Sequence, residues 1–306
     1  MAFQHTIDKP IEVSGIGLHS AVPVEIRLLP AAASRGIVFR RTDLDNFEIP
    51  ASWKHIARVS YATSLMRRGV LISTTEHILS ALISMEIDNV TVEINALELP
   101  ILDGSCLPWV DLLAKAGRRR QRAQRSILQV TEPVEVIEGS KRIALLPDTQ
   151  FRITTQVQFP HPMVGRQEME IEITPQSFAR EIAPARTFGF LEQLPQMKDM
   201  GLIRGGSLEN AVVFDQDSVM NPEGLRFPDE CCRHKVLDLI GDLALIGHPL
   251  RGHVIAEHAG HAMHTALVLK LMRNRSLWEL TTAEATSAEG VAAPQSALEL
   301  TQAATD

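Results

Sequence analysis

The sequence predicts an α+β protein made of two similar units, each a β-sheet layer with helices. Three observations support this fold class. The order strands, helix, strand, helix occurs twice, a basic stretch separates the two occurrences, and 306 residues are more than one hydrophobic core normally holds. We therefore expect a first domain at 1–117, a linker at 118–126 and a second domain at 127–272.

The first unit begins as a sheet. Short runs rich in β-branched residues alternate with Gly, Pro and Asp, as in antiparallel hairpins, at residues 11–14, 24–29, 37–41, 63–66 and 70–73. Helical periodicity follows at 75–85, then a strand at 89–94 and a helix at 105–116. The motif that begins at Gly15 lacks the third glycine and the βαβ continuation of a dinucleotide-binding fingerprint, so it indicates a hairpin turn.

The second unit repeats this order. Its strands are expected at residues 127–136, 142–146, 151–159 and 168–173, followed by a helix at 229–246, a strand at 252–257 and a helix at 261–272. An apolar segment at 188–208, broken by Gly and Pro, is expected to form an insert. Few large apolar residues follow Leu280, so the tail at 273–306 is expected to be disordered.

Composition excludes several classes of protein. The chain has no 18-residue apolar run and no secretory signal at its N-terminus, so we expect a cytoplasmic protein without a transmembrane segment. A net charge of -7 disfavours nucleic acid as a partner, and the arginines at 118–125 are interpreted as an exposed linker. Too few cysteines are present for a disulfide framework, so free thiols are expected at Cys106, Cys231 and Cys232.

Polar residues gather on one face of the helix expected at 229–246. At 100° per residue His234, Asp238 and Asp242 fall within an 80° arc that also approaches Lys235, and apolar residues fill the opposite side. Such an arc is commonly a solvated face with weak ion pairs, and taken alone this pattern favours that interpretation.

The helix expected at 75–85 strengthens the case for chemistry. Ser73 followed by Glu76 matches a capping box, which is an equally good explanation of Glu76. His77 is harder to explain structurally. Together with His234 and Asp238 it makes a three-ligand set with one open position, as catalytic zinc requires, and the adjacent Glu76 would reach a water molecule on the metal.

A competing cluster is formed by His258, His261 and His264. Their i, i+3 spacing would present three imidazoles only if the whole segment were helical. Gly260 interrupts it, and the preceding residues resemble a strand, so we expect these histidines to diverge at a strand-to-helix turn. One of them can still serve catalysis.

Several motifs resemble a known family. They begin at Gly17 (GLH), Thr74 (TTEH), Pro100 (PILDGS), Ala185 (ARTFGF), Arg233 (RHKxxDxxGD) and Gly260 (GHA). In this order they resemble the bacterial UDP-3-O-acyl-N-acetylglucosamine deacetylases from about residue 3 to residue 272. The resemblance implies a zinc hydrolase that removes acetate from the glucosamine nitrogen in the committed step of lipid A synthesis. It also implies two α+β domains packed helix layer to helix layer, a β-α-α-β sandwich, with the site between them.

The resemblance assigns roles to individual residues. His77, His234 and Asp238 correspond to the metal ligands, and Glu76 to the general base. His261 corresponds to a cationic catalytic partner. The remaining assignments place Asp242 against His261, and Lys235 and Thr187 at the developing oxyanion.

Substrate contacts are also implied. The insert that contains Phe188 would form a passage for the fatty acyl chain, although its periodicity alone favours an ordinary core. Phe159 and His161 correspond to the uridine side, and the remaining expected contacts are Leu18, Phe190, Gly206, Ser207 and His258. Two positions differ from some members of the family: His258 stands where some carry a lysine near the nucleotide diphosphate, and Gln193 where some carry an acidic residue.

Three hypotheses about function remain open. The first is the UDP-sugar deacetylase, as a monomer with one Zn²⁺ per chain, although two histidines and a carboxylate also accept Fe²⁺. The second keeps the metal but acts on another N-acyl sugar or a peptide amide. The third is a non-catalytic module that binds nucleic acid through its arginines, which the complete set of candidate site residues disfavours.

Overall fold

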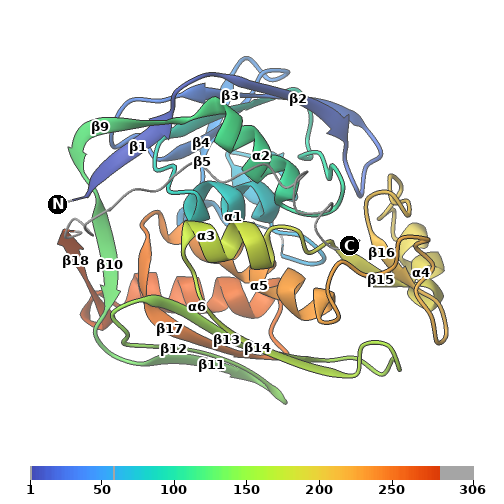
Figure 1. The fold of residues 1–306 in the computed structure, drawn as a ribbon. Coiled ribbons are helices and arrows are strands. Elements are labelled where there is room, and N and C mark those ends of the chain that lie inside the picture. The colour runs from blue at the N-terminus through green and yellow to red at the C-terminus, as the bar shows by residue number, and fades with distance from the viewer. Residues whose placement is uncertain (1, 58, 283–306) are drawn as a thin grey trace, which may run out of the picture.

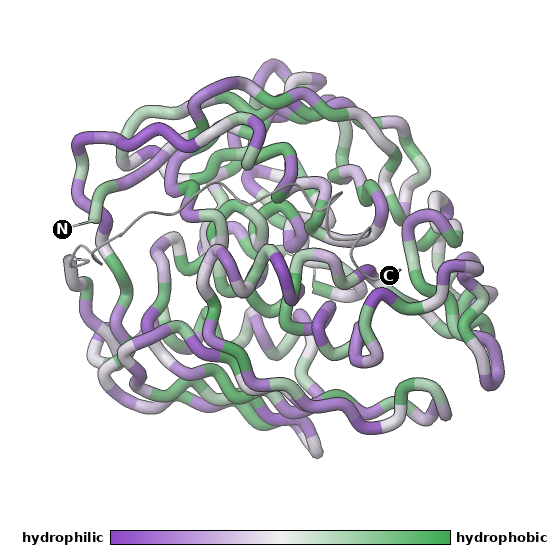
Figure 2. The backbone as a smooth tube through the Cα atoms, viewed as in Figure 1, coloured by the Kyte–Doolittle hydropathy of each residue, from purple (hydrophilic) through white to green (hydrophobic). Residues whose placement is uncertain are grey.

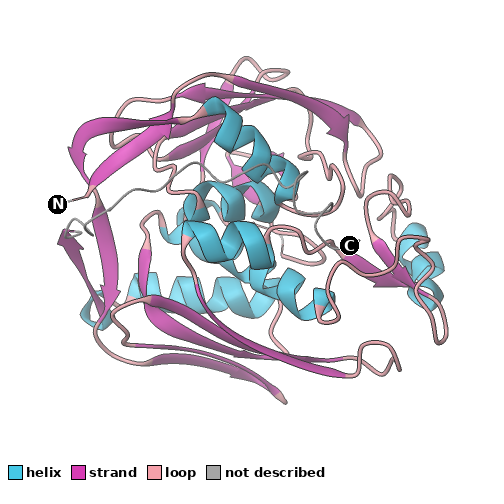
Figure 3. Ribbon diagram, viewed as in Figure 1, coloured by secondary structure: helices cyan, strands magenta, loops and turns pink. Residues whose placement is uncertain are grey.

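The computed structural model describes residues 2–57 and 59–282. Two β-sheets form the outer layers, and the main helices lie between them (Figure 1). Colouring by secondary structure shows the helices enclosed between the strands of the two layers (Figure 3). The predicted α+β fold class and the β-α-α-β order of layers are confirmed.

The first half carries a five-stranded sheet in the order β2-β3-β8-β4-β5. Its strands are β2 (Ile11–Ile16), β3 (Pro23–Pro30), β4 (Ile37–Arg41), β5 (Phe47–Pro50) and β8 (Val90–Ile94). Neighbours are antiparallel except for β4 and β8. The other elements are the 3-10 turn Trp53–His55, the hairpin β6 (Leu65–Arg67) and β7 (Val70–Ile72), and helices α1 (Glu76–Ser84) and α2 (Leu107–Ala116).

The second half carries a seven-stranded sheet in which β17 pairs with three strands, β10, β12 and β13. Its strands are β10 (Ser126–Val130), β11 (Val134–Glu138), β12 (Lys141–Leu146), β13 (Phe151–Gln158), β14 (Arg166–Glu172), β17 (Leu250–Glu257) and β18 (Trp278–Thr282). Its helices are α3 (Pro175–Ser177), continued by a π-helical turn Phe178–Ile182, then α5 (Glu230–Leu243) with a 3-10 turn Ala244–Ile246, and α6 (His261–Arg273).

Each half places one helix in an equivalent crossover. Strands β4 and β8 are parallel, as are β13 and β17, and parallel neighbours require a long connection across the sheet. The first connection contains α1 and the second contains α5. These two helices pack against each other at the centre of the molecule, so the ends that carry polar residues lie at the boundary of the two halves.

Packing of α1 on α5 is unusually close at one point. A Cβ atom added to Gly241 of α5 would lie 2.1 Å from the carbonyl oxygen of Glu76. Most side chains of α1 are buried, which is expected of a helix enclosed on all sides. One continuous apolar cluster joins the cores of both halves, including Phe39, Trp109, Leu128 and Leu237. The outer strands alternate hydrophobic and hydrophilic residues (Figure 2), as expected when one face of a sheet meets the core.

A small lobe projects at one edge of the molecule (Figure 1). It consists of the parallel strands β15 (Phe188–Phe190) and β16 (Val212–Phe214), the 3-10 turn Leu191–Gln193 and helix α4 (Leu194–Asp199). A separate apolar cluster supports the lobe, with Phe190, Val212 and Phe214 buried in it. The apolar segment predicted as an insert lies in this lobe.

The basic segment is not a free linker. Residues Arg118–Gln124 form strand β9, which pairs antiparallel with β1 (Phe3–Ile7). The arginine side chains remain mostly exposed, yet several have partners: Arg118 pairs with Glu86, and the Arg120 guanidinium lies 3.6 Å from the ring centre of Phe3. The run of charges gave no sign of a strand. The segment forms one because it pairs with the N-terminal strand β1.

Part of the predicted disordered tail is ordered. Beyond Arg273 the chain forms a 3-10 turn, Arg275–Leu277, and strand β18, which pairs antiparallel with β10. The Trp278 indole N–H donates to the carbonyl of Leu271 at 3.2 Å, which ties this strand to α6. The prediction is therefore wrong for 275–282, and residues 283–306 lie outside the described range. Within the described ranges, no helix is long and apolar enough to cross a membrane.

Candidate metal centre and active site

Helix α1 begins with two buried polar residues, Glu76 and His77, which are 3% and 6% exposed. The residue before the helix, Thr75, makes no side-chain capping bond. Instead Oε2 of Glu76 accepts the backbone N–H of Thr63 at 3.0 Å. The capping-box explanation of Glu76 is therefore wrong, and its carboxyl group faces inward.

The polar face of α5 is also buried. His234, Asp238 and Asp242 are at most 3% exposed, because α1 and α6 cover this side of the helix. Interpretation of the arc as a solvated face is therefore wrong. Lys235, at the border of the arc, places its Nζ atom 2.8 Å from Oδ2 of Asp238.

His77, His234 and Asp238 converge. One ligand atom from each lies within 4.8 Å of the others, and the two imidazole rings meet edge to face with centres 5.1 Å apart. Nδ1 of His234 must donate to the carbonyl of Ala185, 3.0 Å away, since a carbonyl only accepts. The other ring nitrogen, Nε2, then turns its lone pair toward Oδ1 of Asp238 at 3.4 Å.

This arrangement fits a metal cation. Two electron-pair donors face each other at His234 and Asp238, and Nδ1 of His77 is buried without a hydrogen-bond partner. Burial lowers the pKa of His77 to about 3 and also lowers the pKa of His234, so both imidazoles are neutral ligands at pH 7. Burial disfavours the Asp238 carboxylate, but Lys235 and the neighbouring imidazoles outweigh this and hold its pKa below the usual range.

Glu76 has the opposite electrostatic environment. Burial, reinforced by the carboxylates of Asp242 and Asp238, raises its pKa to about 8 despite the opposing effect of His261. A carboxyl group with this pKa is mostly protonated at pH 7 and ionises as the pH rises through about 8, so its carboxylate form can exchange a proton near neutral pH.

A hydrogen-bonded group at the start of α6 completes the site. Oδ2 of Asp242 lies 2.8 Å from Nδ1 of His261 and 2.9 Å from Nδ1 of His264, and Oδ1 accepts the hydroxyl of Thr63. Burial disfavours the His261 cation, but Asp242 and Asp238 overcome it and raise its pKa to about 9. His261 is therefore protonated at pH 7.

The alternative histidine cluster does not assemble as three imidazoles. His258 lies at the strand-to-helix turn, and its Nε2 is 3.4 Å from Nε2 of Gln156. His261 and His264 come together with Asp242 and offer ligand atoms within 4.8 Å of one another. Both of their Nδ1 atoms already bond to that carboxylate, so hydrogen bonding accounts for this group without a metal.

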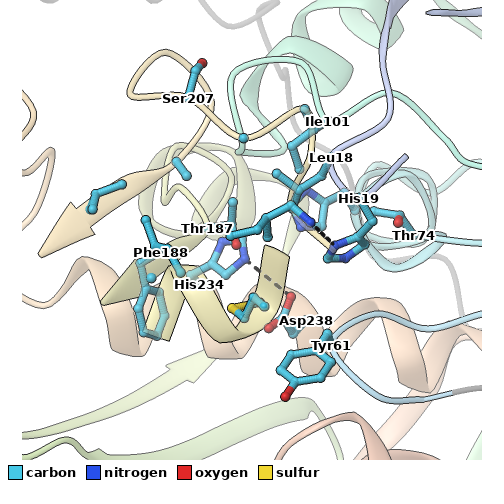
Figure 4. Close-up of a pocket in the computed structure, with 18 of the residues that line it drawn as sticks. Leu18, His19, Tyr61, Thr74, Ile101, Thr187, Phe188, Ser207, His234 and Asp238 are labelled. Atoms are coloured by element: carbon cyan, nitrogen blue, oxygen red, sulfur yellow. Dashed lines mark hydrogen bonds and ion pairs between the residues drawn. The ribbon is translucent and has the colours of Figure 1, made fainter. Parts of the chain in front are cut away.

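A cavity of about 360 Å³ opens above these groups. Figure 4 shows Tyr61 and Ser207 at opposite ends of the view, with His234 and Asp238 between them. The segment between β15 and β16 contributes apolar lining residues: Leu191, Leu194, Met197, Ile203 and Leu208. Helices α1, α5 and α6 contribute polar lining residues, among them Glu76, Lys235 and His261.

The predicted substrate contacts divide into two groups. Leu18, Phe188, Gly206 and Ser207 line the cavity, as does Thr187, the predicted oxyanion contact. The others lie outside its wall: Phe159, His161 and Phe190 pack with Phe214 as an aromatic cluster behind Phe188, and His258 lies on its turn.

Sequence reasoning missed Tyr61 and undervalued His19. Tyr61 lines the cavity, is 55% exposed, and has the left-handed backbone angle φ of 65° that bulky residues rarely adopt. His19 was assigned no role of its own, yet it lines the cavity with a buried Nε2 atom that has no partner. Its position depends on Glu98, which accepts the backbone N–H groups of His19 and Ser20, each at 2.8 Å. The neighbouring Gly17-Leu18-His19 motif was the available signal.

Comparison with known proteins agrees with this site. Residues 4–273 match the model of the family LpxC, described as UDP-3-O-acyl N-acetylglycosamine deacetylase. Three relatives carry the name UDP-3-O-acyl-N-acetylglucosamine deacetylase. The protein of Solibacter usitatus is 61% identical, with 92% of this chain and 95% of the relative aligned. The protein of Myxococcus xanthus is 45% identical, with 94% of this chain and 92% of the relative aligned. That of Nitratidesulfovibrio vulgaris is 46% identical, with 90% of this chain and 89% of the relative aligned. The resemblance drawn from the motifs is confirmed, and the chain belongs to the LpxC family of metal-dependent deacetylases.

Proposed function

We propose that this chain hydrolyses the N-acetyl group of UDP-3-O-(3-hydroxyacyl)-N-acetylglucosamine and releases acetate, the committed step of lipid A biosynthesis. The observation that carries the proposal is the buried set His77, His234 and Asp238 at the floor of a cavity with one polar and one apolar part. Family membership supplies the substrate class.

The donor set supports one Zn²⁺ per chain, with two neutral imidazoles and one carboxylate as ligands. Fe²⁺ accepts the same ligands, so the metal in the cell depends on availability. When bound, the metal supplies Lewis acidity for the amide carbonyl and acidifies water at neutral pH.

Glu76 is the proposed general base. Oε2 is held by the Thr63 N–H, which leaves Oε1 to take a proton from the attacking water. As the water oxygen adds to the amide carbon, negative charge develops on the carbonyl oxygen. Lys235 and the Thr187 hydroxyl are proposed to stabilise that charge, and loss of one such donor typically costs about 100- to 1000-fold in rate.

His261 is the proposed general acid. It is cationic at pH 7, and Asp242 holds its Nδ1 atom, so Nε2 is available to donate a proton to the departing nitrogen. The C–N bond then breaks and its electron pair stays on the nitrogen, which takes the proton from His261. The products are the free amine of the glucosamine and acetate. Thr63 and His264 support the same carboxylate and keep it oriented.

The two parts of the cavity support an orientation for the substrate. The apolar part, in the lobe of β15, α4 and β16, suits the fatty acyl chain, with Phe188 at its inner edge. The Phe188 ring also lies 5.8 Å from Nζ of Lys235, between the apolar part and the polar floor. Contacts of Phe159, His161 and His258 with the uridine diphosphate remain predictions, as do the cytoplasmic location and the monomeric state.

The test is acetate release from UDP-3-O-acyl-N-acetylglucosamine by the purified protein, with simple N-acetyl sugars as comparison substrates. Metal content is measured in parallel for the wild type, His234→Ala and Glu76→Ala. We expect His234→Ala to lose both metal and activity, and Glu76→Ala to lose activity with metal retained. Absence of acetate release by the metal-loaded wild type would reject the substrate.

A further inference from the structure

A fully buried ion pair lies directly behind the metal centre. Arg186 precedes Thr187 in the chain, and Glu230 is the first residue of α5. Their side chains are 2% and 1% exposed, and the Arg186 Nε atom lies 2.9 Å from Oε1 of Glu230. A buried pair of this kind is costly to desolvate and contributes little net stability, which raises the question of what it does.

The Glu230 carboxylate accepts four hydrogen bonds. Oε1 receives the backbone N–H and the Nε atom of Arg186, at 3.0 and 2.9 Å. Oε2 receives Nη2 of Arg186 at 3.2 Å and the backbone N–H of Arg226 at 2.7 Å. Nη2 of Arg186 also donates to the carbonyl of Gly224 at 2.7 Å. The planar guanidinium therefore fixes its own backbone against the first turn of α5.

That backbone carries the partner of a metal ligand. Ala185, the neighbour of Arg186, supplies the carbonyl that accepts Nδ1 of His234. His234 lies one helical turn after Glu230 in α5. The Arg186–Glu230 ion pair and the His234–Ala185 hydrogen bond therefore join the same two segments, residues 185–186 and the first turns of α5.

A second arginine, Arg226, links this segment to the first half of the molecule. Arg226 donates to the carbonyl of Pro184 at 2.9 Å and pairs with Asp103 at 3.0 Å. The N–H of Thr187 donates to the carbonyl of Gly104 at 2.8 Å. Residues 184–187 are thus held on both sides of the Ala185 carbonyl, and this carbonyl has little freedom to move.

We propose that Arg186 is a positioning residue for the metal centre. Through Glu230 it holds the Ala185 carbonyl where it fixes the proton on Nδ1 of His234 and leaves Nε2 free as a ligand. The inference rests on the proposed metal site. Groups that orient a ligating histidine typically change metal affinity by about 10- to 100-fold when they are removed.

A second buried ion pair, between Arg125 and Asp88, is the control that distinguishes an effect on the metal site from a general loss of stability. Arg125 and Asp88 have side chains that are 9% and 11% exposed, and Nε lies 2.8 Å from Oδ1. Neither residue lines the active-site cavity. Arg→Lys at either position keeps the positive charge but loses the fork of the guanidinium, so both substitutions disturb a buried pair in the same way.

The experiment compares Arg186→Lys, Arg125→Lys and the wild type. The dissociation constant for Zn²⁺ is measured by competition with a chromophoric chelator, and the Tm of each metal-free protein is recorded. We expect both variants to lower Tm, and only Arg186→Lys to weaken Zn²⁺ binding, by about 10- to 100-fold. If Arg186→Lys does not fold, Glu230→Gln replaces it, because the amide keeps an acceptor oxygen but loses the charge.

Two results would overturn the proposal: a Zn²⁺ dissociation constant within twofold of the wild type in the Arg186 or Glu230 variant, or equal weakening in Arg125→Lys. No substrate is involved in this measurement. A wild type that binds Zn²⁺ tightly but releases no acetate would therefore reject the proposed substrate and leave the positioning role intact.

Discussion

The substitution Glu76→Gln tests the catalytic role of Glu76 without removing a proposed metal ligand. In Glu76→Gln the amide oxygen can still accept the Thr63 N–H, but the side chain cannot take up a proton. We expect kcat to fall by about 100- to 10,000-fold, the usual contribution of general acid–base catalysis, with metal content and Tm maintained. Steady-state kinetics, metal analysis and thermal unfolding measure the three quantities. More than a tenth of wild-type kcat in the variant would contradict the assignment of Glu76 as base.

His261 makes stability depend on pH. Its pKa is about 9 in the folded protein and ordinarily 6.5, so folding favours the protonated form. The stabilisation is fully present below pH 6.5 and is lost as the pH rises through about 9. We expect the Tm of the wild type to exceed that of His261→Gln most at pH 6, and this difference to shrink steadily up to pH 9.5. A difference that stays constant over this range would show that His261 is not held as a cation by Asp242.

Individual site residues differ in how far sequence could predict them. His234, Asp238 and Asp242 share a helix face, and this follows from local periodicity. The bonds from Thr63 and His264 to Asp242 depend on how the loop before β6 meets α5 and α6, so no local sequence pattern predicts them. Tyr61 was missed for the same reason, because an exposed loop residue has no periodic signal.

At the scale of elements, the contact of α1 with α5 decides where the ligands sit. In Gly241→Ala the new methyl group would meet the Glu76 carbonyl at 2.1 Å, and backbone cannot yield as a side chain can. Alanine improves helix propensity by about 1 kcal/mol, but overpacking typically costs about 1–3 kcal/mol. We expect a net loss in the free energy of unfolding, measured in urea, together with weaker Zn²⁺ binding, since His77 follows Glu76.

Gly260→Ala is the control for this substitution. Its added Cβ atom meets nothing within 4 Å, and its φ of -140° suits any residue. Its free energy of unfolding should stay close to that of the wild type. If Gly241→Ala were as stable as this control and bound Zn²⁺ equally well, the close approach of the two helices would not be important for the site.

Helices and central strands were more predictable than edge strands. Apolar periodicity located α1, α5 and α6 to within a few residues, because a helix with a buried face carries apolar residues at regular spacing. Strands β9 and β18 were taken for a linker and a tail, since each is polar and gains its order from a partner distant in the chain, β1 and β10. Pairing of this kind has no signature within the segment.

At the scale of the whole molecule, the proposed metal ligands come from both halves. The repeated order of elements predicted two similar units, but only their packing brings His77 of α1 to His234 and Asp238 of α5. A ligand that binds the folded state alone stabilises it by about 2.7 kcal/mol at a free concentration of 100 times its dissociation constant. The same cation would therefore act as a cross-link between the halves.

We expect chelation to lower Tm, and added Zn²⁺ to restore it, in a single cooperative transition, because His77 and the other two ligands come from opposite sides of the central interface. His77→Ala leaves only two ligands, so its Tm should be nearly insensitive to Zn²⁺ over the same concentrations. Differential scanning calorimetry of both proteins, with and without chelator, measures these shifts. An equal Zn²⁺ response in the variant would place the stabilising metal elsewhere, and a wild type without any response would mean that the interface is held by packing alone.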